Sequence, residues 1–202
     1  MNEVEKIKNQ LKKYLKDLKE EDKIKELNDL KLFLHNLSPF KEEPVDCIIW
    51  VKNDKVIAND YNPNKVAPPE MELLKVSIME DGYTQPIVTF LEKEGYTVID
   101  GFHRNRVGKE VKEVNERVKG YLPITIIRPS QEDKGDRIAS TIRHNRARGK
   151  HQIQGMSQIV LELKKRNWSD NRIAKNLGMD SDEILRLTQI GGLKEMFKDN
   201  DF

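Results

Sequence analysis

Apolar residues recur at helical spacing along the first 37 residues of the chain. Steps of three and four residues connect Val4, Ile7, Leu11, Tyr14 and Leu18, and the same spacing resumes from Ile24 to Leu37 after an acidic break. The pattern predicts a helical segment, unbroken or hinged, with one apolar stripe and solvated remaining faces. The stripe has to pack on the body of the protein, fold back as a hairpin or pair with another chain, and the sequence leaves all three arrangements open.

Short β-rich runs replace this spacing from residue 45 to about residue 130, after a linker that contains Pro39 and Pro44. The predicted elements are a hairpin of strands 46–51 and 55–58 around Asn53 and Asp54, a helix over 69–80, strands over 86–91 and 96–100, a helix after Gly101 and a strand over 122–127. The remaining residues are predicted to be helical. We therefore expect a helical extension over 1–44, a β-containing domain over 45–130 and a helical domain over 131–202.

A helix-turn-helix pattern lies in the helical domain, in the run WSDNRIAKNLGMDSDEILRL. Its apolar positions, which would form the core of the motif, are Ile173, Leu177, Ile184 and Leu187. Gly178 suits the turn, Ser169 suits the start of the first helix, and Asp180 or Ser181 suits the start of the second. The spacing and the caps predict the same helix boundaries independently.

The predicted recognition helix carries the wrong charge for DNA at its start. Asp180, Asp182 and Glu183 form an acidic face, and Arg186 is the basic residue near it. Arg172, Lys175 and Arg186 are the expected DNA contacts, with weak, salt-dependent binding to backbone phosphates. The alternative is a module that keeps the shape of the motif and binds a protein instead.

Composition narrows the class of protein. The 202 residues hold 36 Lys and Arg against 34 Asp and Glu, so the overall charge does not indicate nucleic-acid binding. One window, residues 141–151, is basic without any acid. The apolar runs fall far short of the ~20 residues of a membrane helix, and no signal peptide is apparent, so we expect a cytoplasmic protein without a membrane partner. Cys47, the single cysteine, excludes an internal disulfide and a multi-cysteine zinc site.

The stretch YTVIDGFHRNR offers the clearest chemistry, because a strand ends in an acid, turns on one glycine and opens a basic helix. Gly101 permits close approach of a ligand, the helix N-terminus presents backbone amides, and His103, Arg104 and Arg106 add positive charge. This arrangement suits a phosphate, and Asp100 suits a metal ion or a hydroxyl. The alternative is an ordinary turn whose arginine pairs with a nearby glutamate.

The order GYTQPIVTF, a hairpin strand and DGFHRNR resembles the N-terminal domain of ParB-type proteins, members of the ParB/sulfiredoxin fold. DGFHR is nearest to the DGQHR and DGHHR variants and to IbrB-like prophage coactivators. The resemblance implies an α+β, sulfiredoxin-like nucleotide-binding domain followed by a helix-turn-helix region. It also implies that Gly101 and Arg104 bind a nucleotide's phosphates, and that Asp100 is a candidate for catalysis. The further residues expected at the nucleotide are Gln85, Phe102, His103 and Arg106.

Departures from the family pattern limit what can be carried over. Sulfiredoxins place a nucleophilic cysteine where this chain has Phe102, so we expect no sulfiredoxin activity. ParB switches use a Glu-Asn pair followed by Arg to hold magnesium. Here Asn145 and Arg148 fit that pattern, and His144 replaces the acid. Asn145 is therefore the expected Mg²⁺ ligand, and Asn145, Arg146 and Arg148 are expected at the nucleotide, ATP or CTP. A metal site built on His103 and His144 would lack a third ligand.

These observations lead to three hypotheses. The first is a nucleotide-binding, DNA-associated regulator of the partition or prophage-coactivator type. The second is an NTPase or free-serine-kinase-like phosphotransferase that uses Asp100 at the same site. The third is a protein-interaction subunit without catalysis, with the N-terminal helices joining a second copy or another protein.

Overall fold

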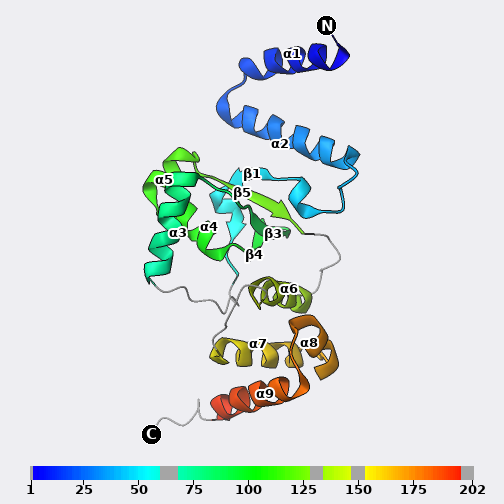
Figure 1. Ribbon diagram of the computed structural model, residues 1–202, viewed down its shortest axis with the longest axis vertical. Helices are drawn as coiled ribbons and strands as arrows, with labels where there is room; N and C mark the ends of the chain where they lie inside the picture. Colours follow the sequence, from blue (N-terminus) through cyan, green and yellow to red (C-terminus); the bar gives the residue numbers. More distant parts are fainter. Residues whose placement is uncertain (1, 60–67, 128–133, 147–152, 197–202) are drawn as a thin grey trace.

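The computed structural model describes residues 2–59, 68–127, 134–146 and 153–196. Figure 1 shows three parts along the long axis: a helical hairpin, a sheet covered by helices, and a group of helices at the C-terminal end. Within the described ranges, no helix combines the length and apolarity that crossing a membrane requires.

The N-terminal segment is hinged. Helix α1 (Glu3–Lys16) and helix α2 (Glu20–Leu37) are joined by a short turn, and Asn2 caps α1 by accepting a hydrogen bond from the Val4 amide. The acidic break of the sequence forms the first turn of α2, where negative charge is favoured by the helix dipole. Neither helix contains a buried residue.

A mixed five-stranded sheet forms the centre of the molecule, in the order β1-β5-β3-β4-β2. Its strands are β1 (Ile49–Lys52), β2 (Val56–Ile57), β3 (Ile87–Leu91), β4 (Tyr96–Asp100) and β5 (Tyr121–Ile126). The predicted antiparallel hairpin of β3 and β4 is confirmed, whereas β2 runs parallel to β4 and β3 runs parallel to β5. This combination of strands and helices confirms the predicted α+β class.

The predicted hairpin over residues 46–58 is wrong. Strand β1 pairs antiparallel with β5, with Ile49 opposite Ile124, and β2 lies at the opposite edge of the sheet beside β4. Residues 53–55 form a short 3-10 turn (Asn53–Lys55) that carries the chain from one edge to the other. Pairing with β5 buries Ile49 and pairing with β4 buries Val56, so each strand gains a different apolar neighbour.

Three helices, α3 (Pro68–Asp81), α4 (Phe102–Glu110) and α5 (Lys112–Arg117), lie together beside the sheet (Figure 1). The single helix expected after Gly101 is interrupted at Val111, which has extended backbone angles. The Asn115 side chain donates to the carbonyl of Gly108 at 2.9 Å. Gly108 has no room for a side chain, because a Cβ there would collide with the Tyr83 hydroxyl and with Leu122. Helix α4 is thereby held close to the sheet.

The C-terminal helices share a core of their own. They are α6 (Lys134–Arg146), α7 (Ile153–Lys165), α8 (Asp170–Leu177) and α9 (Ser181–Met196). The four predicted core residues of the helix-turn-helix are all buried in it. Ser169 accepts from the Arg172 amide at 3.2 Å, and Asp180, rather than Ser181, accepts from the Glu183 amide at 2.7 Å. The predicted helix-turn-helix geometry is confirmed, with Gly178 left-handed at φ 65°.

Candidate functional site

The candidate site is the turn between β4 and α4. Gly101 adopts a left-handed conformation (φ 90°, ψ 25°) and ends the strand, and its carbonyl accepts the first helical bond from the Asn105 amide at 2.9 Å. Glycine suits this position because side-chain-bearing residues seldom adopt positive φ. No side chain at the N-cap position caps α4. The first amides of the helix therefore present partial positive charge at the end of the strand.

The Arg104 side chain folds back over this turn. Its Nη2 donates to Asp100 Oδ2 at 3.1 Å and to the Pro86 carbonyl at 3.2 Å, and Nη1 donates to Gln85 Oε1 at 3.3 Å. A Cβ on Gly101 would lie 2.9 Å from Nη2, so the glycine also makes room for the guanidinium. The Asp100 side chain is 5% exposed and that of Arg104 is 15% exposed. The structure thus brings Gln85, Asp100, Gly101 and Arg104 together as one charged group, in which Asp100 is buried, Arg104 is half-buried and Gln85 is exposed.

Three buried polar atoms around the turn have no hydrogen-bond partner among the described residues. They are Arg104 Nε, Asn105 Oδ1 and Asn59 Oδ1. Asn59 follows β2 and donates through Nδ2 to the Val98 carbonyl of β4 at 2.7 Å, which holds it beside the middle of that strand, two residues before Asp100. A buried polar atom without a partner costs about 1–3 kcal/mol. Such atoms are reasonable places for a water molecule or a polar ligand to bind.

The Tyr83 side chain contacts the first turn of α4. Its hydroxyl donates to the Arg104 carbonyl at 2.9 Å, and burial raises the pKa of Tyr83 to about 12. Trp50 packs edge-on against its ring at 6.4 Å. Sequence reasoning missed Asn59, Tyr83 and Asn105. Asn105 lies within the DGFHRNR motif, where its position in the first turn was available as a signal.

The remaining motif residues have different surroundings. Phe102 packs against the sheet core, and its ring meets the half-buried ring of His103 edge-on at 5.3 Å. Arg106 forms a bidentate pair with Glu110, at 2.9 Å and 2.8 Å, and its side chain is exposed. Arg106 therefore forms the pair with a nearby glutamate that the sequence left open as an alternative. It is not part of the hydrogen-bonded group around Arg104.

The second predicted element lies at the end of α6, a helix that packs against β4 (Figure 1). Asn145 and Arg146 occupy its last turn, but their side chains lie outside the described part of the structure, as does the whole of Arg148. Arg143, one turn earlier, donates to Asn176 Oδ1 of α8 at 2.9 Å. Among the described residues, no group of three or more His, Cys, Asp or Glu side chains is arranged to hold a metal ion.

The predicted DNA contacts differ in how they are held. Arg172 pairs with Asp136 of α6 at 2.9 Å, and its guanidinium lies 3.7 Å from the ring centre of Trp168. Arg172 is therefore engaged in packing α8 within the helical domain. Lys175 and Arg186 are exposed. Asp182 and Glu183 occupy the first turn of α9, so the acidic start predicted for this helix is present in the fold.

Comparison with known families gives two matches. Residues 40–132 match the ParB N-terminal domain, and residues 151–199 match the IbrB-like C-terminal HTH domain. The first range includes the whole sheet and the β4–α4 turn. The second begins just before α7 and includes the helix-turn-helix.

Individual proteins and solved structures are also similar to this chain. The uncharacterized protein YbdM of Escherichia coli (strain K12) is 53% identical over 193 residues, which cover 95% of this chain and 91% of that protein. A Pnob8-like ParB-N domain has a similar fold, with a TM-score of 0.50 at 15% identity over 75% of this chain and 73% of that one.

A truncated chromosome-partitioning protein ParB from Caulobacter crescentus, complexed with CTP-gamma-S, is also similar in structure. Its TM-score is 0.41 at 16% identity, over 75% of this chain and 87% of that one. The two domain matches follow one another in the order that DGFHR and the helix-turn-helix pattern imply. The chain therefore belongs to the ParB-like proteins and carries a ParB N-terminal domain followed by an IbrB-like helix-turn-helix domain.

Proposed function

We propose that this protein is a nucleotide-binding, DNA-associated regulator that binds a nucleoside triphosphate at the β4–α4 turn. The observation that supports this site is the half-buried Arg104 guanidinium, which lies over Gly101 at the start of α4 and whose buried Nε has no hydrogen-bond partner among the described residues. Membership of the ParB-like proteins supports the same site, since a Gly-x-x-Arg turn of this kind binds nucleotide phosphates in that family.

Phosphate binding at this turn would use two sources of positive charge. The amides of the first turn of α4 point toward the end of β4, and Arg104 adds a charge-assisted donor beside them. Asp100 holds Arg104 in place through the pair at 3.1 Å. A bound phosphate would compete with Asp100 for the guanidinium. We therefore assign Asp100 a positioning role in binding.

Mg²⁺ would accompany the triphosphate as its counter-ion. Asn145 is the proposed protein ligand, placed on α6, the helix that packs against β4. An amide oxygen is a suitable ligand for Mg²⁺, which usually keeps several waters and binds the phosphates directly. Arg146 and Arg148 would then add charge from the same segment.

Binding of the nucleotide is tested by isothermal titration calorimetry with ATP, CTP, GTP and UTP, each with and without Mg²⁺. Arg104→Ala should weaken binding about 10- to 100-fold, which corresponds to the loss of a hydrogen bond to a charged group. Arg106→Ala is the matched control, because it removes an arginine from the same helix that pairs outward with Glu110. We expect it to change affinity about twofold or less. Absence of binding to every nucleotide, or equal losses in both variants, would contradict the proposed site.

DNA association is proposed to be weak and electrostatic. Lys175 and Arg186 are exposed basic residues of the motif, Arg172 is also exposed but pairs with Asp136, and the first turn of α9 is acidic. Replacing one basic side chain that binds a phosphate should reduce the slope of log affinity against log salt by about 0.9. Fluorescence anisotropy with a labelled duplex should therefore show binding at low salt that disappears at high salt. Tight binding to one sequence that survives high salt would show that α9 reads bases despite its acids.

Turnover of the nucleotide is the second candidate function, since Asp100 is an acid directly beside Arg104. An NTPase or free-serine-kinase-like reaction would require Asp100 to leave Arg104 and hold a metal or accept a proton. Phosphate release and serine phosphorylation should be measured for the wild type and Asp100→Asn at equal nucleotide occupancy. Turnover that disappears in the variant would assign catalysis to Asp100. Binding without turnover in the wild type would define a nucleotide-sensing module.

A further inference from the structure

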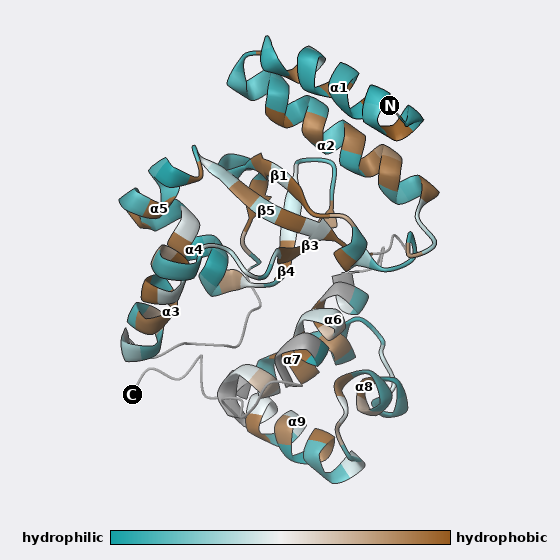
Figure 2. Cartoon of the chain, turned by 45° about the horizontal axis from the view of Figure 1, so that its top comes forward, coloured by the Kyte–Doolittle hydropathy of each residue, from teal (hydrophilic) through white to brown (hydrophobic). Residues whose placement is uncertain are grey.

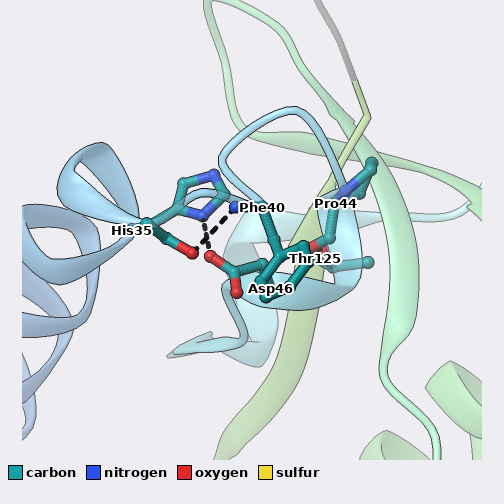
Figure 3. Close-up of polar contacts among 6 residues, drawn as sticks. His35, Phe40, Pro44, Asp46 and Thr125 are labelled. Atoms are coloured by element: carbon teal, nitrogen blue, oxygen red, sulfur yellow. Dashed lines mark hydrogen bonds and ion pairs between the residues drawn. The ribbon is translucent and has the colours of Figure 1, made fainter.

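Helix α2 contacts the body of the protein through polar side chains. The Asn28 amide donates to the Trp50 carbonyl at 2.6 Å and accepts from the Trp50 amide at 3.0 Å, and Lys31 donates to the Ile48 carbonyl at 3.0 Å. At the end of α2, His35 pairs with Asp46 at 2.6 Å, which lowers the pKa of the Asp46 carboxyl (Figure 3). Because β1 is an edge strand, these contacts satisfy backbone groups that would otherwise face solvent.

The side of α2 that faces away from β1 is apolar, and its second half is exposed. This outer stripe consists of Leu27, Leu30, Phe33, Leu34 and Leu37. Phe33 is 59% exposed, Leu34 62% and Leu37 69%, and Figure 2 shows the hydrophobic residues along the second half of the helix. A surface helix normally packs its apolar side against the protein core, whereas α2 packs its polar side against the core and exposes its apolar side. Contiguous exposed apolar surface of this kind marks an interaction site.

A groove lined by α1 and by the first turn of α2 matches this stripe. The groove has a volume of about 460 Å³ and is lined by Lys8, Leu11, Lys12, Leu15, Lys16 and Lys23. Its apolar surface comes from leucines, and lysines form its rim. Val4 and Ile7 extend the apolar side of α1 and are also exposed. A helix of 14 residues without a buried side chain is marginal in water, so α1 needs a packing partner.

The charges beside these two surfaces are complementary. The outer stripe of α2 is flanked on one side by Asp22 and Glu26, whereas Lys12 and Lys16 of α1 lie on the rim of the groove. Within one chain, the hairpin satisfies only part of this charge pattern, because Glu26 of α2 interacts with the side chain of Tyr14 of α1. A two-fold axis would place α2 of each copy beside α1 of the other, with acids facing lysines and leucines facing leucines.

We propose that two copies of the chain pair through their α1–α2 hairpins, the outer stripe of each packing against the lysine-rimmed groove of the other as a four-helix bundle. The hairpin precedes residue 40, where the match to the ParB N-terminal domain begins. The interface is therefore separate from the β4–α4 turn, and pairing requires no nucleotide.

The mass of the nucleotide-free full chain in solution tests the pairing. At about 20 µM, light scattering after gel filtration should give about 47 kDa, twice the 23.6 kDa of one chain. Leu34→Glu combined with Leu37→Glu should give one chain's mass without unfolding, because both residues are exposed. Asn36→Glu adds charge to the same helix away from the stripe and should leave the dimer intact. A monomeric wild type, or a dimer that survives the double substitution, would overturn the proposal.

A charge exchange tests which surfaces meet. Lys12→Glu with Lys16→Glu, and separately Asp22→Lys with Glu26→Lys, should each be monomeric alone, since like charges then face each other. Mixing the two variants should restore a dimer, because each altered surface meets its complement in the other chain. A mixture that stays monomeric would contradict the arrangement. Sedimentation of a monomeric wild type with anionic phospholipid vesicles would instead assign the stripe to a membrane surface.

Discussion

Two of the left-handed glycines precede helices of interest, α4 at the candidate site and α9 of the helix-turn-helix, and their surroundings differ. At the β4–α4 turn, Gly101 is crowded by Arg104, whose guanidinium is held by Asp100. At the α8–α9 turn, Gly178 is also left-handed, but a Cβ there would meet no atom of the described residues within 4 Å. Charge is buried at the first turn and lies on the surface at the second. At the first turn, the conformation of Gly101 therefore makes room for a charged side chain, whereas the second turn is stabilised by the apolar core of the helices around it.

The largest expected effect tests the claim that an apolar core holds the helix-turn-helix. Ile184 is fully buried and Leu185, its neighbour, is 55% exposed. Ile184→Ala should lower the free energy of unfolding by about 3 kcal/mol, within the range for a buried Ile or Leu. Leu185→Ala should change it by less than about 0.5 kcal/mol. Urea unfolding followed by circular dichroism measures both, and equal losses would show that the surface also stabilises this region.

The next largest change in the free energy of unfolding is expected from removing one acidic side chain near each glycine turn. Asp100→Ala leaves the Arg104 guanidinium without its charged partner and should cost about 2 kcal/mol, less than for a fully buried pair, because the Pro86 carbonyl and Gln85 still accept from it. Asp182→Ala removes an exposed acid from the first turn of α9 and should cost about 0.5 kcal/mol. Urea unfolding compares the two variants. A loss at Asp182 as large as that at Asp100 would mean that the acidic face has a structural role.

The glycines themselves provide a matched pair. Alanine at Gly178 should cost about 1 kcal/mol, the strain of a left-handed alanine in open space. Gly101→Ala bears the same strain and also displaces Arg104, so it should cost about 2 kcal/mol. It should also weaken nucleotide binding, which calorimetry can measure. If the two variants unfold at the same urea concentration and bind nucleotide like the wild type, Gly101 has no special role.

The smallest changes in the free energy of unfolding are expected from replacing two half-exposed arginines. Arg106→Ala removes one exposed pair within α4 and should cost about 0.3 kcal/mol. Arg172→Ala removes both the pair with Asp136 and the stacking on Trp168, and should cost about 1 kcal/mol. Thermal unfolding at low and high salt separates the two interactions, because salt screens the ion pairs more than the stacking. Equal losses at low salt would remove the structural role assigned to Arg172.

The sequence by itself determined the features that depend on neighbours along the chain. The β3–β4 hairpin, the turn at Gly101, the caps at Ser169 and Asp180 and the left-handed Gly178 all follow from residues within a few positions of one another. Backbone conformation and capping are local properties, so these predictions were accurate, although the sequence left Asp180 and Ser181 open as the second cap. The motif DGFHR placed the candidate site for the same reason.

Tertiary structure decided the features that depend on distant partners. Only the fold sends β1 and β2 to opposite edges of the sheet, and only the fold brings Gln85 and the Pro86 carbonyl to Arg104. It also sets the apolar stripe of α2 away from the sheet, because Asn28 finds hydrogen-bonding groups on the β1 edge that leucine would leave unpaired. Hydrogen bonds and apolar burial are shared between segments far apart in the chain, and a local pattern does not specify which segments meet.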